Sequence, residues 1–171
     1  MFANKRILVV ILIVVALLIL VTFQSKAKEP INETEPGTNF MINNTFNGIP
    51  GTKNFHLSEF HSKDGMHVPE TYYGNLQKLM INLQVLRDSL GVAITVNSGY
   101  RSPAHNAAIG GKPGSMHLQA AAADIVATGY TAAQVQERIV KLIASGQMQN
   151  GGLGSYSSFT HYDVGPVRRW T

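Results

Sequence analysis

The stretch 115–124 reads Ser-Met-His-Leu-Gln-Ala-Ala-Ala-Ala-Asp and is the most informative part of this chain. It places His117 seven residues before Asp124, with only alanine between positions 120 and 123. Small side chains allow the backbone to fold back closely, so the imidazole and the carboxylate can meet. If residues 119–126 are extended, the period of two turns Asp124 toward the packed core strands. A second histidine, His161, lies near the C-terminus.

These three side chains form a pattern of metal ligands. Two imidazoles and one carboxylate with an open fourth position match the arrangement that catalytic zinc prefers. Structural zinc usually takes thiolates, and the chain contains no cysteine. The sequence therefore predicts a Zn²⁺ site at His117, Asp124 and His161. The alternative is that the two histidines are ordinary polar residues that flank an alanine-rich stretch.

The segments around this stretch predict an α+β fold. Leucines and a methionine recur at helical spacing after Pro69 as far as Gly91, a residue typical of a helix end. The short segment 92–96 is β-branched at every position except Ala93, which favours a strand, and Thr131 is a suitable N-cap for a second long helix. Residues 151–164 alternate enough to predict a hairpin. We expect a small antiparallel sheet that carries the zinc site, packed by two main helices and preceded by one N-terminal transmembrane helix.

The first 25 residues form a separate unit. Lys5 and Arg6 precede the run Ile7–Phe23, which contains apolar residues and one threonine. Spanning helices need about 17–25 apolar residues and signal-peptide cores about 7–15, so a membrane anchor is favoured over a cleaved signal. Positive charge before the run predicts that the remainder lies outside the cytoplasm, at the periplasmic side or the cell surface. Cleavage of the run as a signal would instead release a secreted protein.

The remainder of the chain divides by composition into a linker and one domain. Residues 26–53 are rich in Asn, Glu, Thr, Gly and Pro, and we expect a flexible linker. Residues 54–171 are enough for one domain whose core needs no disulfides. From residue 26 onward 12 Lys and Arg face 10 Asp and Glu, with no basic block suited to a phosphate backbone. Nucleic acid is therefore not an expected partner.

Several motifs resemble one known family. The segments are Ser98-Gly99-Tyr100-Arg101-Ser102, the Ser-x-His-(six residues)-Asp stretch, the late His-x-Asp and the ending Gly165-Pro166-Val167-Arg168-Arg169-Trp170. In this order they resemble the zinc D-Ala-D-Ala carboxypeptidases and murein endopeptidases of peptidase family M15. The resemblance implies His117, Asp124 and His161 as zinc ligands. It also implies Arg101 as the clamp for a substrate carboxylate and Ser115 as a residue close to the scissile carbonyl.

Two positions depart from the family pattern. Family members usually carry glycine where this chain has Ala120, and a methyl group there is costly if the residue has positive φ. Several branches place a carboxylate or histidine two or three residues before the last zinc histidine as general base, but here these residues are Ser158 and Phe159. Asp163 is the nearest carboxylate. Two roles stay open for it: taking a proton from the nucleophilic water, or orienting His161.

The metal-ligand pattern and the apolar N-terminal run, together with what the resemblance implies, predict an exported, membrane-anchored zinc metallopeptidase that hydrolyses an amide bond in the peptide stems of peptidoglycan. An alternative is a non-catalytic cell-wall-binding domain on the same fold, which the missing upstream carboxylate and Ala120 would suit. A third possibility is a structural membrane protein whose histidines are incidental.

Overall fold

The computed structural model describes residues 45–46 and 48–171. The expected membrane segment and most of the expected linker lie outside these residues. Within the part that is described, no helix is both long and apolar enough to cross a bilayer.

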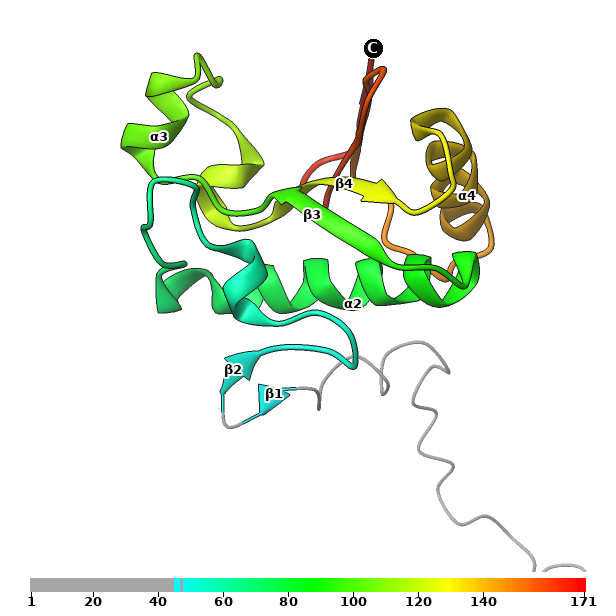
Figure 1. The fold of residues 1–171 in the computed structure, drawn as a ribbon, viewed down its shortest axis with the longest axis horizontal. Helices are drawn as coiled ribbons and strands as arrows, with labels where there is room; N and C mark the ends of the chain where they lie inside the picture. The colour runs from blue at the N-terminus through cyan, green and yellow to red at the C-terminus, as the bar shows by residue number, and fades with distance from the viewer. Residues whose placement is uncertain (1–44, 47) are drawn as a thin grey trace, which may run out of the picture. The chain divides into compact units, whose positions relative to one another are not determined.

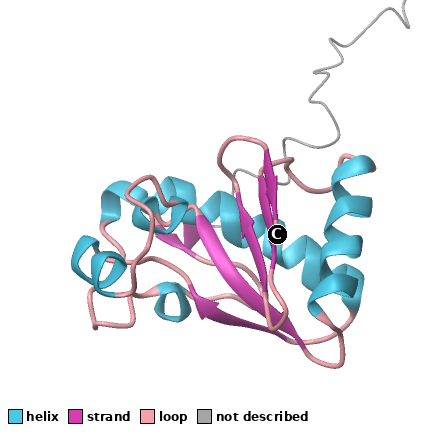
Figure 2. Ribbon diagram, turned by 90° about the horizontal axis from the view of Figure 1, so that it is seen from above, coloured by secondary structure: helices cyan, strands magenta, loops and turns pink. Residues whose placement is uncertain are grey.

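The described chain folds into helices around one five-stranded sheet (Figures 1 and 2). In chain order the elements are β1 (Thr45–Phe46), β2 (Ile49–Pro50), the 3₁₀ helices η2 (Leu57–Phe60) and η3 (Glu70–Tyr72), α2 (Tyr73–Leu90), β3 (Ile94–Ser98), α3 (Pro103–Ala108), the 3₁₀ helix η4 (Met116–Gln119), β4 (Ala122–Ala127), α4 (Ala132–Ala144), β5 (Gly152–Ser155), β6 (Thr160–Asp163) and β7 (Arg168–Trp170).

The sheet is mixed, so the prediction of an antiparallel sheet was wrong in one strand. The order is β3-β4-β6-β5-β7; the first three pairings are antiparallel, whereas β7 runs parallel to β5. Both neighbours of β6 are already in place when the chain leaves Asp163. It passes to the outer edge of β5, and turning back from β6 gives it the direction of β5. The predicted hairpin is confirmed as the β5–β6 pair.

The helices form as their sequence patterns predict. In α2 the apolar stripe is buried, and Gly91 ends the helix at φ 71°, a left-handed conformation that glycine adopts without strain. Helix α4 begins after Thr131, whose hydroxyl accepts a hydrogen bond from the backbone N–H of Gln134. Figure 1 shows α2 running along one side of β3 and β4. The prediction of two main helices packed on the sheet is confirmed.

The two faces of the sheet differ in chemistry. Ala123 and Ile125 of β4 and Tyr162 of β6 belong to the hydrophobic core. Because side chains alternate along a strand, Asp124 and His161 point to the opposite face. The expectation that Asp124 faces the packed core was therefore wrong: its face carries polar groups, while the alternate residues fill the core beneath.

Some described residues before position 54 also contact the helices. Strand β2 pairs with β1, and the side-chain amide of Gln77 in α2 both accepts from the N–H of Gly51 and donates to its carbonyl oxygen. Pro50 is buried. The last residues of the expected linker are thus attached to α2.

Candidate metal centre

Pairing in the sheet brings the expected site residues into one row. Asp124 of β4 lies opposite His161 of β6, and His161 lies opposite Gly154 of β5. Gly154 in turn pairs with Trp170 of β7. The row crosses four strands, so residues far apart in the chain share one face.

His117 reaches this row from η4. The Ser115 hydroxyl caps that 3₁₀ helix by accepting from the N–H of His117, at 3.4 Å between nitrogen and oxygen. The ring Nδ1 of His117 donates to the carbonyl oxygen of Gly99 at 2.6 Å. A side chain at position 99 would lie 2.7 Å from the backbone of Phe60, so glycine is required there. This packing fixes the His117 ring with Nε2 toward the sheet.

Ala120 turns the chain from η4 into β4. It adopts φ 52° and ψ 28° and is, among the described residues, the one non-glycine residue with positive φ. The concern raised by the sequence is thus confirmed, because a left-handed alanine costs about 1–2 kcal/mol. The buried methyl group offsets part of that cost.

The three candidate ligands present their donor atoms to one point. His117 Nε2 lies 3.2 Å from His161 Nδ1 and 3.3 Å from Asp124 Oδ1, and the last two atoms are 2.8 Å apart. All three residues are buried. Ligands about 2.05 Å from a tetrahedral zinc ion would be about 3.3 Å from one another. The spacing therefore fits a single metal ion of this kind.

The outer hydrogen bonds fix which atoms carry protons. Gly99 offers an acceptor to His117 Nδ1, so that nitrogen holds the hydrogen and Nε2 has a lone pair. Likewise His161 Nε2 donates to Asp163 Oδ2 at 3.2 Å, which leaves a lone pair on Nδ1. Two lone pairs and a carboxylate oxygen facing one another repel unless a cation lies between them. The donor set is that of a metal site.

Electrostatics agree with this arrangement. Burial is the largest influence on the Asp124 carboxyl and opposes its ionisation, but the close contacts with the His117 and His161 rings together outweigh it and hold the pKa of Asp124 well below the usual range. Burial lowers the pKa of His117. Burial also opposes a charge on His161, yet hydrogen bonds to Asp124 and Asp163 outweigh it and raise its pKa. Without metal, a proton on His161 thus takes the place of the cation.

Asp163 lies behind His161, on the opposite side of the ring from Asp124. The carboxylate is fully buried and accepts from the N–H groups of Gly152 at 3.1 Å and Gly165 at 2.9 Å, as well as from Arg168 Nη2 at 2.8 Å. Burial raises the pKa of this carboxyl, but the hydrogen bonds from His161 and Gly165 and the nearby charges of His161 and Arg168 together outweigh burial and lower the pKa overall. Asp163 is therefore an ionised acceptor that holds the proton of His161 on Nε2.

Arg101 adjoins the cluster through Asp124. Its Nη2 donates to Asp124 Oδ2 at 2.6 Å, and its Nε donates to the hydroxyl of Ser98 at 3.0 Å. The backbone N–H of Arg101 also donates to the carbonyl oxygen of His117. Because a guanidinium has five N–H groups, three stay free of these two side-chain bonds. Arg101 can thus hold Asp124 and bind an anion at once.

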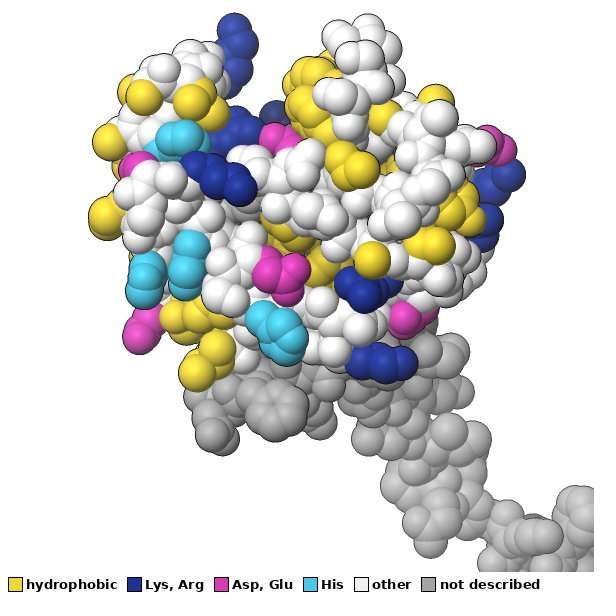
Figure 3. All heavy atoms as spheres, in the orientation of Figure 1, with side chains coloured by type: hydrophobic (Ala, Val, Ile, Leu, Met, Phe, Trp, Pro, Cys, Tyr) yellow, Lys and Arg dark blue, Asp and Glu magenta, His cyan; other side chains and the backbone are white. Residues whose placement is uncertain are grey.

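A cavity of about 530 Å³ opens over the cluster. Figure 3 shows the corresponding hollow between a lobe over α3 and a lobe over the β5–β6 hairpin. The cavity is lined by Arg101, Gly110, Gly111, Lys112, Gly114, Ser115, Met116, His117, Asp124, Tyr156, Phe159, His161, Arg168 and Trp170. Five of the six predicted site residues line it, whereas Asp163 lies beneath its floor.

Sequence reasoning missed residues at the C-terminal end as members of the site. Arg168 and Trp170 lie on the site face of β7, paired with Gly152 and Gly154. A Cβ at position 152 would lie 2.0 Å from Asp163 Oδ2, and one at position 154 would lie 2.5 Å from the Trp170 ring. The Gly-x-Gly and Arg-x-Trp spacings carried this signal, because a period of two places each pair on one face.

The remaining histidines stay outside the cluster, as expected. His61 and His67 stack on each other with ring centroids 4.3 Å apart, and neither belongs to a group of three potential ligands among the described residues.

An α+β domain with a buried two-histidine, one-carboxylate cluster beneath an open cavity defines a candidate mononuclear metal centre. A family model described as Peptidase M15 matches residues 52–163, and the chain belongs to this family. Comparison with individual curated proteins gives no match. The family and the cluster together fit a zinc peptidase.

Proposed function

We propose that this chain is a zinc metallopeptidase that hydrolyses an amide bond in the stem peptides of peptidoglycan, of the D-Ala-D-Ala carboxypeptidase or murein endopeptidase type. The observation that supports it most is the convergence of His117 Nε2, Asp124 Oδ1 and His161 Nδ1 under a cavity, in a chain of the M15 family. Zn²⁺ held by these atoms would supply Lewis-acid chemistry, polarising the scissile carbonyl and making a water molecule acidic enough to attack near neutral pH.

The residues around the cluster have separate tasks in this proposal. Arg101 binds a carboxylate of the substrate through its free N–H groups, which orients the amide bond over the site. Ser115 keeps the η4 turn closed and thereby aims His117, while its position in the cavity wall suits contact with the substrate carbonyl.

For Asp163, the geometry supports the orienting role rather than that of general base. Its carboxylate faces the ring nitrogen of His161 that points away from the cluster, and its other partners are protein donors. An acceptor in this place fixes the tautomer and direction of a histidine ligand. We therefore assign Asp163 as a positioning residue.

We further propose that the domain acts outside the cytoplasm, attached to the membrane through residues 7–23. The support is the apolar run after Lys5 and Arg6. Fractionation of cells and protease treatment from outside test this directly: the domain should fractionate with membranes and be cut from the outer side. A soluble extracellular product lacking the run would show a cleaved signal instead.

The bond that is cut can be identified with one experiment. Full-length zinc-loaded protein is incubated with purified peptidoglycan, and the released fragments are identified by mass. Loss of a terminal alanine indicates a carboxypeptidase, and separation of crosslinked stems indicates an endopeptidase. Pelleting with peptidoglycan without any released fragment, for wild type and His117→Ala alike, would instead favour a non-catalytic wall-binding domain.

A further inference from the structure

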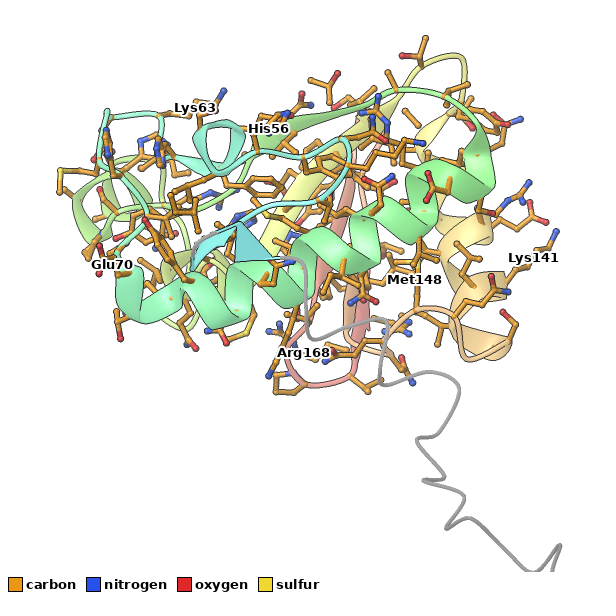
Figure 4. All side chains as sticks on the ribbon, turned by 90° about the horizontal axis from the view of Figure 1, so that it is seen from below. His56, Lys63, Glu70, Lys141, Met148 and Arg168 are labelled. Atoms are coloured by element: carbon orange, nitrogen blue, oxygen red, sulfur yellow. The ribbon has the colours of Figure 1, made fainter. Side chains whose placement is uncertain are left out.

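Arg168 is a second guanidinium in the cavity, besides that of Arg101. It lies on β7, and its pairing with Gly152 places it on the same face as Asp163. Its neighbour Arg169 points to the other face, where it bonds Asn150. Figure 4 shows Arg168 beside the C-terminal strands, well apart from Lys141 on α4.

Neighbouring groups hold the Arg168 side chain in place and leave several of its N–H groups available. One nitrogen, Nη2, donates to Asp163 Oδ2 at 2.8 Å, and the guanidinium lies 5.5 Å from the centre of the Trp170 ring. The Trp170 Nε1 in turn donates to the hydroxyl of Tyr156 at 3.0 Å, which fixes the ring. The Arg168 side chain stays 44% exposed and lines the cavity. Its other N–H groups can thus meet a ligand.

Arg101 and Arg168 flank the cluster in equivalent ways. Arg101 is anchored by Asp124, and Arg168 is anchored by Asp163. These two carboxylates contact opposite nitrogens of the same ring, that of His161. The two guanidinium groups therefore lie on opposite sides of His161.

The charge of the cavity favours an anionic ligand. Lys112 adds a third cation to its lining, whereas Asp124 is the acidic residue among the described residues that line it. Asp124 is already engaged by Arg101 and the two histidines. A peptide with a single carboxylate would satisfy one of the flanking arginines and leave the other unused.

We propose that Arg168 binds a second carboxylate of the substrate, on the opposite side of the scissile bond from the one held by Arg101. This inference rests on the proposed peptidase function and narrows its substrate class to stem peptides that carry a carboxylate on the acyl side of the scissile bond. The Trp170 ring holds the guanidinium plane, so the site suits the planar, two-donor guanidinium of arginine better than the ammonium group of lysine.

The test uses two synthetic stem peptides that differ only in a side-chain carboxylate or carboxamide on the acyl side of the scissile bond. Each is hydrolysed by zinc-loaded full-length wild type, Arg168→Gln and Arg168→Lys. A charge-assisted hydrogen bond corresponds to about 10–100-fold, so wild type should prefer the acid in kcat/KM by that factor. The preference should fall to about one in the Gln variant and be restored only partly in the Lys variant.

Arg169→Gln is the matched control, because it removes one charge from the same strand on the opposite face. It should keep the wild-type preference. The ratio between the two peptides is the informative quantity, since loss of the Asp163 contact alone would slow both equally. Equal hydrolysis of both peptides by wild type, or an equal loss for both in Arg168→Gln, would overturn the proposal.

Binding of the same peptides to metal-free protein separates this inference from the peptidase function. Calorimetry should show tighter binding of the acid than of the amide in wild type and equal binding in Arg168→Gln. If neither peptide is cut but this difference is found, the peptidase function fails and the Arg168 site stands. Equal binding of both peptides to wild type would refute the site.

Discussion

Replacing Asp163 by asparagine tests how the centre is organised. The carboxylate accepts from four donors: the N–H groups of Gly152 and Gly165 on one oxygen, and His161 and Arg168 on the other. An amide of the same shape has one acceptor oxygen and one donating NH₂ group. In either orientation, two of the four donors face that NH₂ group.

The expected losses of zinc affinity and stability depend on which of the four donors lose their acceptor. Keeping the two backbone donors satisfied turns the NH₂ group toward His161, which then carries its proton on Nδ1, the atom that faces His117 and Asp124. That proton occupies the position of the metal, so zinc affinity should fall by about 10–100-fold. Arg168 is partly exposed and can turn to water, so the loss of stability should be about 1–3 kcal/mol.

Competitive titration with a chelating zinc indicator measures the affinity. Asp88→Asn on the outer side of α2 is the matched control and should bind zinc like wild type. At saturating zinc, Asp163→Asn should regain most of its turnover. Unchanged zinc affinity together with at least a hundredfold lower kcat would refute the orienting role and assign Asp163 as the general base.

Three further predictions concern the same centre. Gly152→Ala should weaken zinc binding in the same titration, because its Cβ would lie 2.0 Å from Asp163 Oδ2; normal affinity would show that the carboxylate can move without cost. Ala120→Gly should change the free energy of unfolding in urea by less than about 1 kcal/mol, because relief of the left-handed strain is offset by the lost methyl group and by the freedom of glycine in the unfolded chain; a loss above about 2 kcal/mol would contradict this. The metal-free domain should be most stable near pH 6.5. Above this pH, stability falls as the pH rises through the raised pKa of His161, because the folded state loses its favoured proton. Below it, stability falls because His117 stays neutral in the folded state while the unfolded chain gains a proton. Urea midpoints across this range check both limbs, and zinc should abolish the loss at alkaline pH.

Local patterns made much of the fold predictable. The buried stripe of α2, the left-handed Gly91 and the Thr131 cap depend on neighbours a few residues away, so the sequence reveals them. Whether β7 is parallel to its neighbour depends instead on which edge of the sheet the chain takes after β6, and no local pattern contains that information. For the same reason the prediction of an antiparallel sheet was wrong.

The site was predictable in part. Ligand chemistry singled out His117, Asp124 and His161, and the structure brings them together. Their protonation could not be predicted, because it depends on Gly99 and Asp163 behind the two rings. Burial of the Asp163 carboxylate behind His161 likewise depends on strand register.

Contacts between segments that are distant in the chain could not be predicted from the sequence. Arg101 looked free to clamp a substrate, yet it also holds Asp124 across 23 residues of chain. Arg168 and Trp170 enter the cavity because β7 pairs with β5 and because Gly152 and Gly154 leave room for side chains above them. These relations arise from the tertiary fold.

The rate of stem-peptide hydrolysis as a function of zinc bound per chain tests the central claim most directly. Metal-free full-length protein is titrated with zinc, and bound metal and turnover are measured on the same samples, with His117→Ala alongside. Turnover should rise in proportion to bound zinc and level off at about one ion per chain, while the variant, which lacks one of three ligands, should neither retain zinc nor cleave. Hydrolysis that is unchanged in His117→Ala, or a wild-type protein that binds one zinc without cleaving any stem peptide, would contradict the account.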